Sequence, residues 1–144
     1  MRLHHVLPEY QDRVRLRLRP FPLEVMGGEA ARRKILEQEW WLAALQEPLA
    51  EFTSFEGDDW PTTTLPAFEA AWCAAQQSES ALLTFDLRVR KAFFAESRNI
   101  GKRDVLFQLA QEVGLDLDRL SRDFDSGRAR EAVLADARAG QEHY

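Results

Sequence analysis

Residues 79–96, ESALLTFDLRVRKAFFAE, predict a long helix that is apolar over a wide arc of its surface. Its apolar side chains fall on two ridges, Leu82, Val89 and Phe93 on one and Leu83, Leu87 and Phe94 on the other. A helix with so broad an apolar surface has to contact other elements on more than one side. We therefore expect this segment to be the central helix of a helical bundle.

The chain before this segment also has a helical pattern. A helix is predicted from Thr64, a good N-cap residue, to about Gln77, with Pro66 in the first turn, where its missing N–H costs least. The Gly, Pro, Asp and Thr content predicts a loop over residues 52–63. An earlier helix is predicted over residues 29–47. The broad apolar stripe of this earlier helix consists of Ile35, Leu36, Trp40, Leu42, Ala43 and Leu45.

The chain after residue 96 continues as helices. Residues 102–113 carry apolar side chains at helical spacing, and Gly114 is a typical residue to end that helix. Asp116 is placed to cap a short helix, and Ser126 is placed to cap a last one that runs to the C-terminus. The chain from residue 29 onward is therefore predicted to be helical apart from its loops.

Residues 12–25, DRVRLRLRPFPLEV, have a different pattern, because apolar and charged side chains alternate as they do in a β-strand. The predicted strand comprises Arg13, Val14, Arg15, Leu16, Arg17, Leu18 and Arg19. Pro20 and Pro22 end it, since proline cannot donate to a strand ladder. A strand needs a neighbour for its backbone N–H and C=O groups, yet no other segment of the chain has this pattern. The predicted fold class is mainly α, with one strand at about residues 13–19.

The composition is that of one globular domain. The chain has 144 residues, of which 45% are hydrophobic and 30% charged, and its net charge is −5. The negative charge disfavours binding to nucleic acid or to anionic membranes. The sequence contains no long apolar run, so it predicts neither a signal peptide nor a membrane span, and the expected compartment is the cytoplasm. A single cysteine excludes an internal disulfide and suits a reducing compartment.

Three stretches resemble the DsbA-like thioredoxin family. They are RPFPLEV at residues 19–25, TLPAFEAAWCAAQQ at residues 64–77, and the run from residue 90 to residue 144 that contains AFFAESRNI, LFQLAQEVGLD and SGRAREAV. Within this family the chain is most similar to the cytoplasmic FrnE-type oxidoreductases, which are related to the 2-hydroxychromene-2-carboxylate isomerases. The resemblance covers nearly the whole chain.

The resemblance implies a division of the chain into three parts. In the family, a helical domain interrupts a thioredoxin fold. Residues 1–28 resemble a remnant of the thioredoxin-like part, residues 29–125 resemble the helical insertion, and residues 126–144 resemble the helix that leads back to the thioredoxin-like part. By this alignment the first strand and the C-x-x-C motif would lie before Met1, and the cis-proline loop and last strands would lie after Tyr144. The resemblance therefore implies that this chain lacks the family's redox centre.

The same alignment implies an open edge on the predicted strand, because its usual partner is the first strand of the family. We expect a second copy of the chain to pair with residues 13–19, which would make the protein a homodimer. In such a dimer, opposed arginines repel unless carboxylates such as Asp12 and Glu24 lie between them. A solvated edge is the alternative.

Few residues suggest chemistry of their own. Cys73 has no second cysteine, and no basic residue lies within one helical turn of it, so we expect a buried structural residue. His4 and His5 are adjacent and therefore point in different directions on a helix, which disfavours a shared metal ion. Asp58 and Asp59 are expected to be solvated in their loop. We predict no catalytic residue, no metal site and no cofactor.

The aromatic residues Trp40, Trp41, Phe55 and Trp60 have two interpretations. They could line an apolar groove for a peptide or ligand, as the helical domain does in the resembling family. The favoured interpretation is that they close a small helical bundle. The pattern alone does not separate these roles.

Two functions follow from these features. The favoured one is a DsbA/FrnE-like domain without its own redox centre, acting as a binding or structural module with a peptide or protein partner. The alternative is a fragment of a cytoplasmic thiol-disulfide oxidoreductase, or of a glutathione-linked isomerase, whose catalytic residues lie outside this chain. The sequence leaves open whether the chain belongs to an enzyme.

Overall fold

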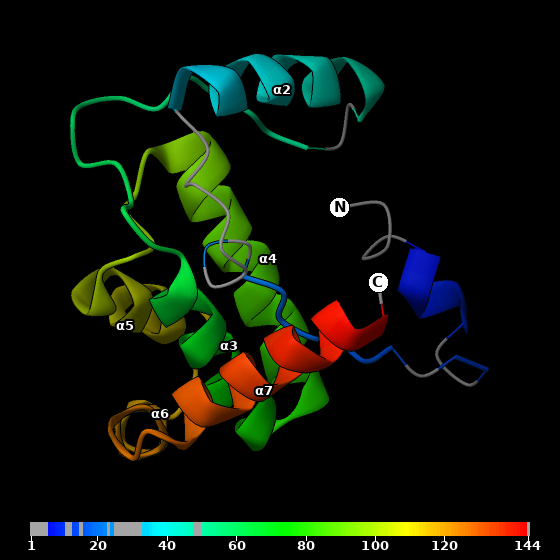
Figure 1. Cartoon of the computed structure of the whole chain (residues 1–144), viewed down its shortest axis with the longest axis vertical. Coiled ribbons are helices and arrows are strands. Elements are labelled where there is room, and N and C mark those ends of the chain that lie inside the picture. Colours follow the sequence, from blue (N-terminus) through cyan, green and yellow to red (C-terminus); the bar gives the residue numbers. More distant parts are fainter. Residues whose placement is uncertain are drawn as a thin grey trace.

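The computed structural model describes residues 6–10, 13–14, 16–22, 24, 33–47 and 50–143 (Figure 1). Its elements are the 3₁₀ helix η1 (Leu7–Tyr10) and the α-helices α2 (Arg33–Gln46), α3 (Leu65–Gln77), α4 (Glu79–Glu96), α5 (Arg103–Glu112), α6 (Leu117–Asp125) and α7 (Arg128–His143). No strand occurs in these ranges. The prediction of a mainly α domain is confirmed.

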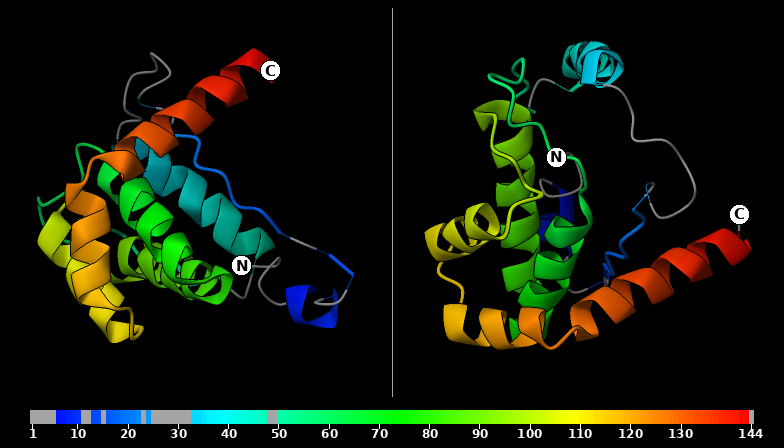
Figure 2. Two further views of the ribbon diagram at one scale, coloured as in Figure 1. Left: turned by 90° about the horizontal axis from the view of Figure 1, so that it is seen from below. Right: turned by 60° about the vertical axis from the view of Figure 1, so that its left-hand side comes forward.

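The centre of the bundle is α3, which packs against α4, α5, α6 and α7, whereas α4 packs mainly against α3 and α5 (Figure 2). The prediction that residues 79–96 form the central helix is therefore wrong. The reason lies in the side chains that α3 presents. Ala70, Cys73 and Ala74 are completely buried, and side chains this small allow helices on several sides to approach closely.

Most predicted helix ends are confirmed. Helix α4 has the predicted bounds, and the side chain of Ser78 accepts a hydrogen bond from the Ala81 N–H at 2.9 Å. Asp116 caps α6 by accepting from the Arg119 N–H at 2.9 Å. Gly114 follows α5 with a φ of 75°, a left-handed conformation that glycine adopts without strain. Local sequence therefore determines where these helices start and stop.

The start of α3 is capped in a way that the sequence does not predict. Thr64 is the N-cap residue, but its side chain makes no capping hydrogen bond. Instead the carboxylate of Glu24 accepts hydrogen bonds from the Thr64 and Leu65 N–H groups at 2.8 and 2.9 Å, and from the hydroxyls of Thr63 and Thr64 at 2.6 and 2.9 Å. Partial burial of Glu24 opposes its ionisation, but these hydrogen bonds outweigh burial and lower the pKa of the carboxyl. Glu24 thereby fixes the N-terminal segment to the bundle.

The predicted strand at residues 13–19 is not formed. Arg15 lies outside the described residues, and the remainder of this stretch forms a turn or has no regular structure. The alternation survives nonetheless, because Leu16 and Leu18 are half-buried while Arg17 and Arg19 are exposed. No backbone hydrogen bond to a described residue involves residues 16–18. The segment has the side-chain pattern of a strand but no neighbouring strand to pair with.

Side chains, not a ladder, hold this segment in place. Arg19 donates from Nε to the Asp136 carboxylate of α7 at 2.8 Å. Phe21 lies so close to Gly140 of α7 that a side chain on Gly140 would collide with its ring. Pro22 is completely buried. The segment therefore crosses α7 as an extended strap before it reaches Glu24.

We predict that Glu24→Gln lowers the free energy of unfolding by about 1 kcal/mol at neutral pH, the usual value of a helix cap. The carboxyl pKa is lowered in the folded state, so its contribution is present above the ordinary value of 4.5 and is lost as the pH falls through the folded value. Urea unfolding as a function of pH measures both effects. Glu9→Gln, which changes an exposed residue of η1, is the control and should leave stability unchanged. An equal loss in both variants would contradict the capping role.

Candidate functional site

An aromatic cluster joins α2 to the C-terminal end of α4. It consists of Trp40, Phe52, Phe55, Trp60, Phe93 and Phe94. Trp40 stacks on Trp60 with ring centroids 5.8 Å apart and meets Phe94 edge to face at 5.0 Å. Trp40 and Phe55 are only 7% and 2% exposed. Aromatic pairs in these geometries add to the free energy of burial, so the cluster anchors α2.

Polar contacts reinforce the same side of α2. The guanidinium of Arg33 donates to the carbonyl oxygens of Phe55 and, at 2.7 Å, Gly57, and it lies 5.6 Å from the ring centroid of Trp60. Glu37 accepts from the Phe55 N–H at 3.0 Å. Together with Trp40, these side chains hold one side of α2 against the loop that follows it.

The opposite side of α2 is apolar and exposed. Ile35, Leu42 and Leu45 are 50%, 63% and 83% exposed. The predicted apolar stripe is therefore buried only in part, and residues 29–32 of the predicted helix lie outside the described residues. Helix α2 has apolar side chains on two sides, and within the part of the chain that the structure describes only the side with Trp40 has a neighbour.

The four aromatic residues predicted to line a groove divide between these two sides. Trp40 and Phe55 lie in the aromatic cluster and each contacts Trp60. Trp41 points away from them and is 55% exposed. The geometry brings three of the residues together by mutual packing, and a ligand-binding role for them stays a prediction.

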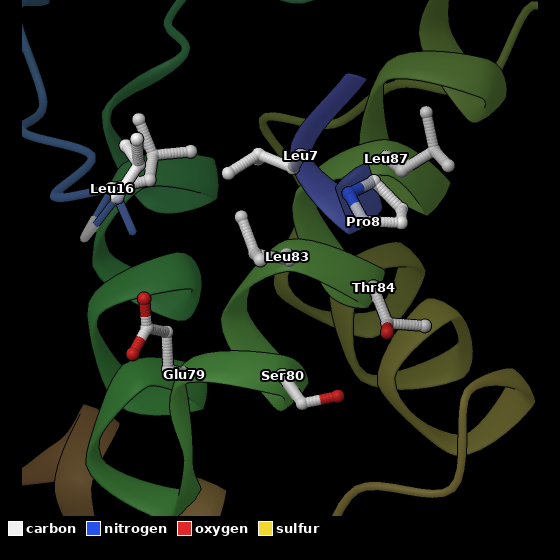
Figure 3. Close-up of a pocket in the computed structure, with 9 residues that line it drawn as sticks. Leu7, Pro8, Leu16, Glu79, Ser80, Leu83, Thr84 and Leu87 are labelled. Atoms are coloured by element: carbon white, nitrogen blue, oxygen red, sulfur yellow. The ribbon is translucent and has the colours of Figure 1, made fainter. Parts of the chain in front are cut away.

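A hollow of about 640 Å³ lies between the N-terminal segment and α4. Figure 3 shows the side chains of Leu7, Leu16 and Leu83 converging on one space. The full lining is Leu7, Pro8, Val14, Leu16, Glu79, Ser80, Leu83, Thr84 and Leu87. The sequence does not predict this site, although the four-residue spacing of Leu83 and Leu87 places both on one face of α4.

Cys73 lies inside α3 and is completely buried, as predicted. Burial raises the pKa of its thiol to about 12, and the negative charges of Asp123 and Glu69 act in the same direction. A thiol with this pKa is almost entirely protonated at neutral pH, and the thiolate is the reactive species. Cys73 has the environment of a structural residue.

The remaining candidates that the structure describes form no reactive group. Asp59 accepts hydrogen bonds from Lys102 at 2.7 Å and Asn99 at 3.0 Å, and these bonds lower the pKa of its carboxyl. His4 and His5 lie outside the described residues, and the side chain of His143 is not described. Among the residues that the structure describes, no group of histidine, cysteine and carboxylate side chains is arranged to hold a metal ion.

A family model described as thioredoxin matches residues 5–143. The chain belongs to the thioredoxin family. The match extends from η1 to the end of α7, so it includes both the extended strap and the whole helical bundle. It agrees with the resemblance to DsbA-like proteins, in which a helical domain interrupts the thioredoxin fold.

Membership of the thioredoxin family makes the thiol the first group to consider, because the family's chemistry depends on reactive cysteines. The single cysteine of this chain is completely buried in the helical core. Two apolar surfaces are accessible in the described part of the chain, namely the outer side of α2 and the hollow beside α4.

Every helix in the described part of the chain is too short or too polar to cross a bilayer.

The two adjacent tryptophans of α2 provide a matched test of the aromatic cluster. Trp40→Ala should destabilise the docking of α2 by about 3 kcal/mol, the usual cost of removing a buried tryptophan side chain. Hydrogen exchange of the α2 amides should then become much faster, because the helix opens locally. Trp41→Ala removes an exposed side chain of the same kind and should leave the exchange of a monomeric sample unchanged. Equal effects from both variants would show that Trp40 does not anchor the helix.

Proposed function

We propose that this chain is the helical domain of a DsbA-like, FrnE-type member of the thioredoxin family that has no redox centre of its own and acts in the cytoplasm by binding other polypeptides. The observation that carries the proposal is the position of Cys73, the only cysteine of the chain, which is completely buried in α3.

Thiol-disulfide exchange requires a thiolate that can reach a disulfide, and usually a second thiol to resolve the mixed disulfide. Cys73 meets neither requirement, because it is buried, its pKa is raised to about 12, and no second cysteine exists in the chain. A rearrangement that exposed Cys73 would have to open the contacts of α3 with its neighbours. We therefore assign the chain a binding role and no thiol catalysis.

The segment from Leu16 to Arg19 supports binding of an extended peptide. Its backbone has no hydrogen-bond partner among the described residues at positions 16–18, and Leu16 faces the hollow beside α4. An added strand would pair with this backbone and place apolar side chains in the hollow. Arg19 is already paired with Asp136, so it is the exposed Arg17 that favours a carboxylate opposite it, whereas a second copy would set arginine against arginine. An acidic, alternating peptide is thus the better partner for this edge.

The second candidate is a fragment of a thiol-disulfide oxidoreductase, or of a glutathione-linked isomerase, whose catalytic residues lie outside this chain. The observation in its favour is the thioredoxin-family match over residues 5–143. The nucleotide sequence before the Met1 codon tests it directly. An in-frame C-x-x-C codon pattern there would favour the enzyme, and a stop codon without such a pattern would favour the binding module.

We expect the purified chain to show no turnover above background in an insulin-reduction assay with dithiothreitol. Cys73→Ser should give the same result, because the buried thiol takes no part in exchange. A thioredoxin with an intact C-x-x-C motif serves as the positive control. Turnover by the chain that disappears in Cys73→Ser would overturn the absence of a redox centre.

The binding role predicts a charge preference. A fluorescein-labelled peptide of alternating valine and glutamate should bind more tightly than one of alternating valine and lysine. Arg17→Glu should reverse this preference, because Arg17 is exposed on the free edge. Fluorescence anisotropy measures both affinities, and Arg138→Glu, which changes an exposed residue of α7, is the control. Binding of neither peptide, or a preference that Arg17→Glu leaves intact, would contradict the proposed edge.

A further inference from the structure

The outer side of α2 has no partner in the described part of the chain. The helix lies at the edge of the molecule across one end of α4, apart from α5, α6 and α7 (Figures 1 and 2). Trp40, Arg33 and Glu37 hold its inner side. The exposed apolar residues on its other side are Ile35, Trp41, Leu42 and Leu45. Large apolar side chains gathered in this way usually mark an interaction surface.

The spacing of these residues is that of a coiled-coil seam. Positions 35, 38, 42 and 45 follow one another at intervals of three, four and three residues, and they are occupied by Ile35, Gln38, Leu42 and Leu45. In heptad notation Ile35 and Leu42 take position a, and Gln38 and Leu45 take position d. Trp40 falls on the opposite side, in agreement with its burial. The exposed stripe is therefore suited to another helix lying along it.

One positive and one negative side chain flank this stripe, placed so that two copies of the helix can pair them. Lys34 and Glu39 are both exposed and take heptad positions g and e, on opposite sides of the seam. They are five residues apart, the interval at which a g residue meets the e residue of the facing helix in a parallel pair. Neither has an ion pair with any residue that the structure describes. A second, identical helix supplies the opposite charge to both.

We propose that α2 of one chain pairs in parallel with α2 of a second copy. The two-fold axis runs along the helices, so Ile35, Leu42 and Leu45 each face their own equivalents. Lys34 of each chain lies beside Glu39 of the second copy, which gives two ion pairs. A free peptide of 14 residues forms little helix in water, but the aromatic cluster holds α2 in helical form before association.

This inference goes beyond the proposed function and is independent of it. It also assigns the dimer to a different surface from the predicted edge at residues 13–19. Two self-pairing surfaces on one chain would build an open assembly, whereas one surface gives a closed dimer. The experiments below therefore separate α2 from that edge.

Sedimentation equilibrium across the micromolar range measures the association. Leu42→Asp should raise the dissociation constant of the dimer by about 10-fold or more, because it places charge in the centre of the seam. Ala43→Asp adds the same charge to the next residue, off the seam, and should leave the constant nearly unchanged. Leu16→Pro should also leave it unchanged. A monomeric parent protein, or a dimer that Leu16→Pro dissociates and Leu42→Asp does not, would overturn the proposal.

Charge reversal tests the parallel arrangement. Lys34→Glu should weaken the dimer, since it places two glutamates beside each other on both sides of the seam. Adding Glu39→Lys to this variant restores the complementary pair and should restore the affinity. No recovery in the double variant would overturn the parallel pairing, because an antiparallel contact does not bring these two residues together.

Cross-linking gives a readout that does not depend on affinity. In a Cys73→Ser background, Gln38→Cys places one thiol at the centre of the seam, where the two copies face each other at a distance that a disulfide can span. Oxidation should produce a covalent dimer. Gln111→Cys, at an exposed position of α5, is the control and should remain largely monomeric. Equal cross-linking of both variants would show that the contact at Gln38 is not specific.

Discussion

The fold depends on the close packing that the small side chains of α3 permit. Ala70, Cys73 and Ala74 have no exposed surface, and four helices lie against this one element. A larger residue at any of these positions would force neighbouring helices apart, and protein interiors accommodate such changes poorly. Glu69, which is 5% exposed, fits into this core because Arg130 of α7 donates to it from Nε at 2.7 Å. The same packing that builds the bundle buries the thiol of Cys73 and raises its pKa to about 12.

The elements outside this core are attached by a few specific side chains. Helix α2 is held through Trp40, Arg33 and Glu37, and the strap before it is held through Arg19 and Glu24. The attachment of α2 leaves its other side without a neighbour in the described part of the chain, and that of the strap leaves the backbone of residues 16–18 without a described hydrogen-bond partner. The surfaces available for association therefore arise from how these elements are anchored, and they lie apart from the bundle core.

Local sequence predicted much of the helical architecture. Residues 79–96 form one helix with the predicted bounds, because the apolar periodicity, Ser78 and the turn after Glu96 all act within a few residues. It did not reveal which helix is central, since apolar breadth describes what a helix can cover and not how closely its neighbours approach. Helix α3 is central because its small side chains let the neighbouring helices approach closely. The capping of α3 by Glu24 was equally hidden, because the two are far apart in the sequence.

The candidate site depends even more than the fold on contacts between residues that are far apart in the sequence. The alternation of apolar and charged side chains in residues 13–19 predicts a strand. A strand also needs a second strand to pair with, and the alternation by itself supplies no partner. Likewise the apolar residues of α2 predict burial without specifying what covers them. Burial of Cys73 could be predicted because it needs only the local Ala-rich helix and the absence of nearby basic residues. The position of Trp41 outside the aromatic cluster depended on the anchoring of Trp40 by distant rings of α4.

These two kinds of surface differ in what association would gain. Along residues 16–18 the gain would be mainly backbone hydrogen bonding, which accepts many sequences and leaves selection to Arg17 and the shape of the hollow. Along α2 the gain is mainly burial of apolar side chains at fixed heptad positions, which admits only a helix of matching pattern. The edge is therefore suited to varied extended peptides and α2 to one defined partner. Together the two proposals give the domain one surface for a constant assembly and another surface that exchanges ligands.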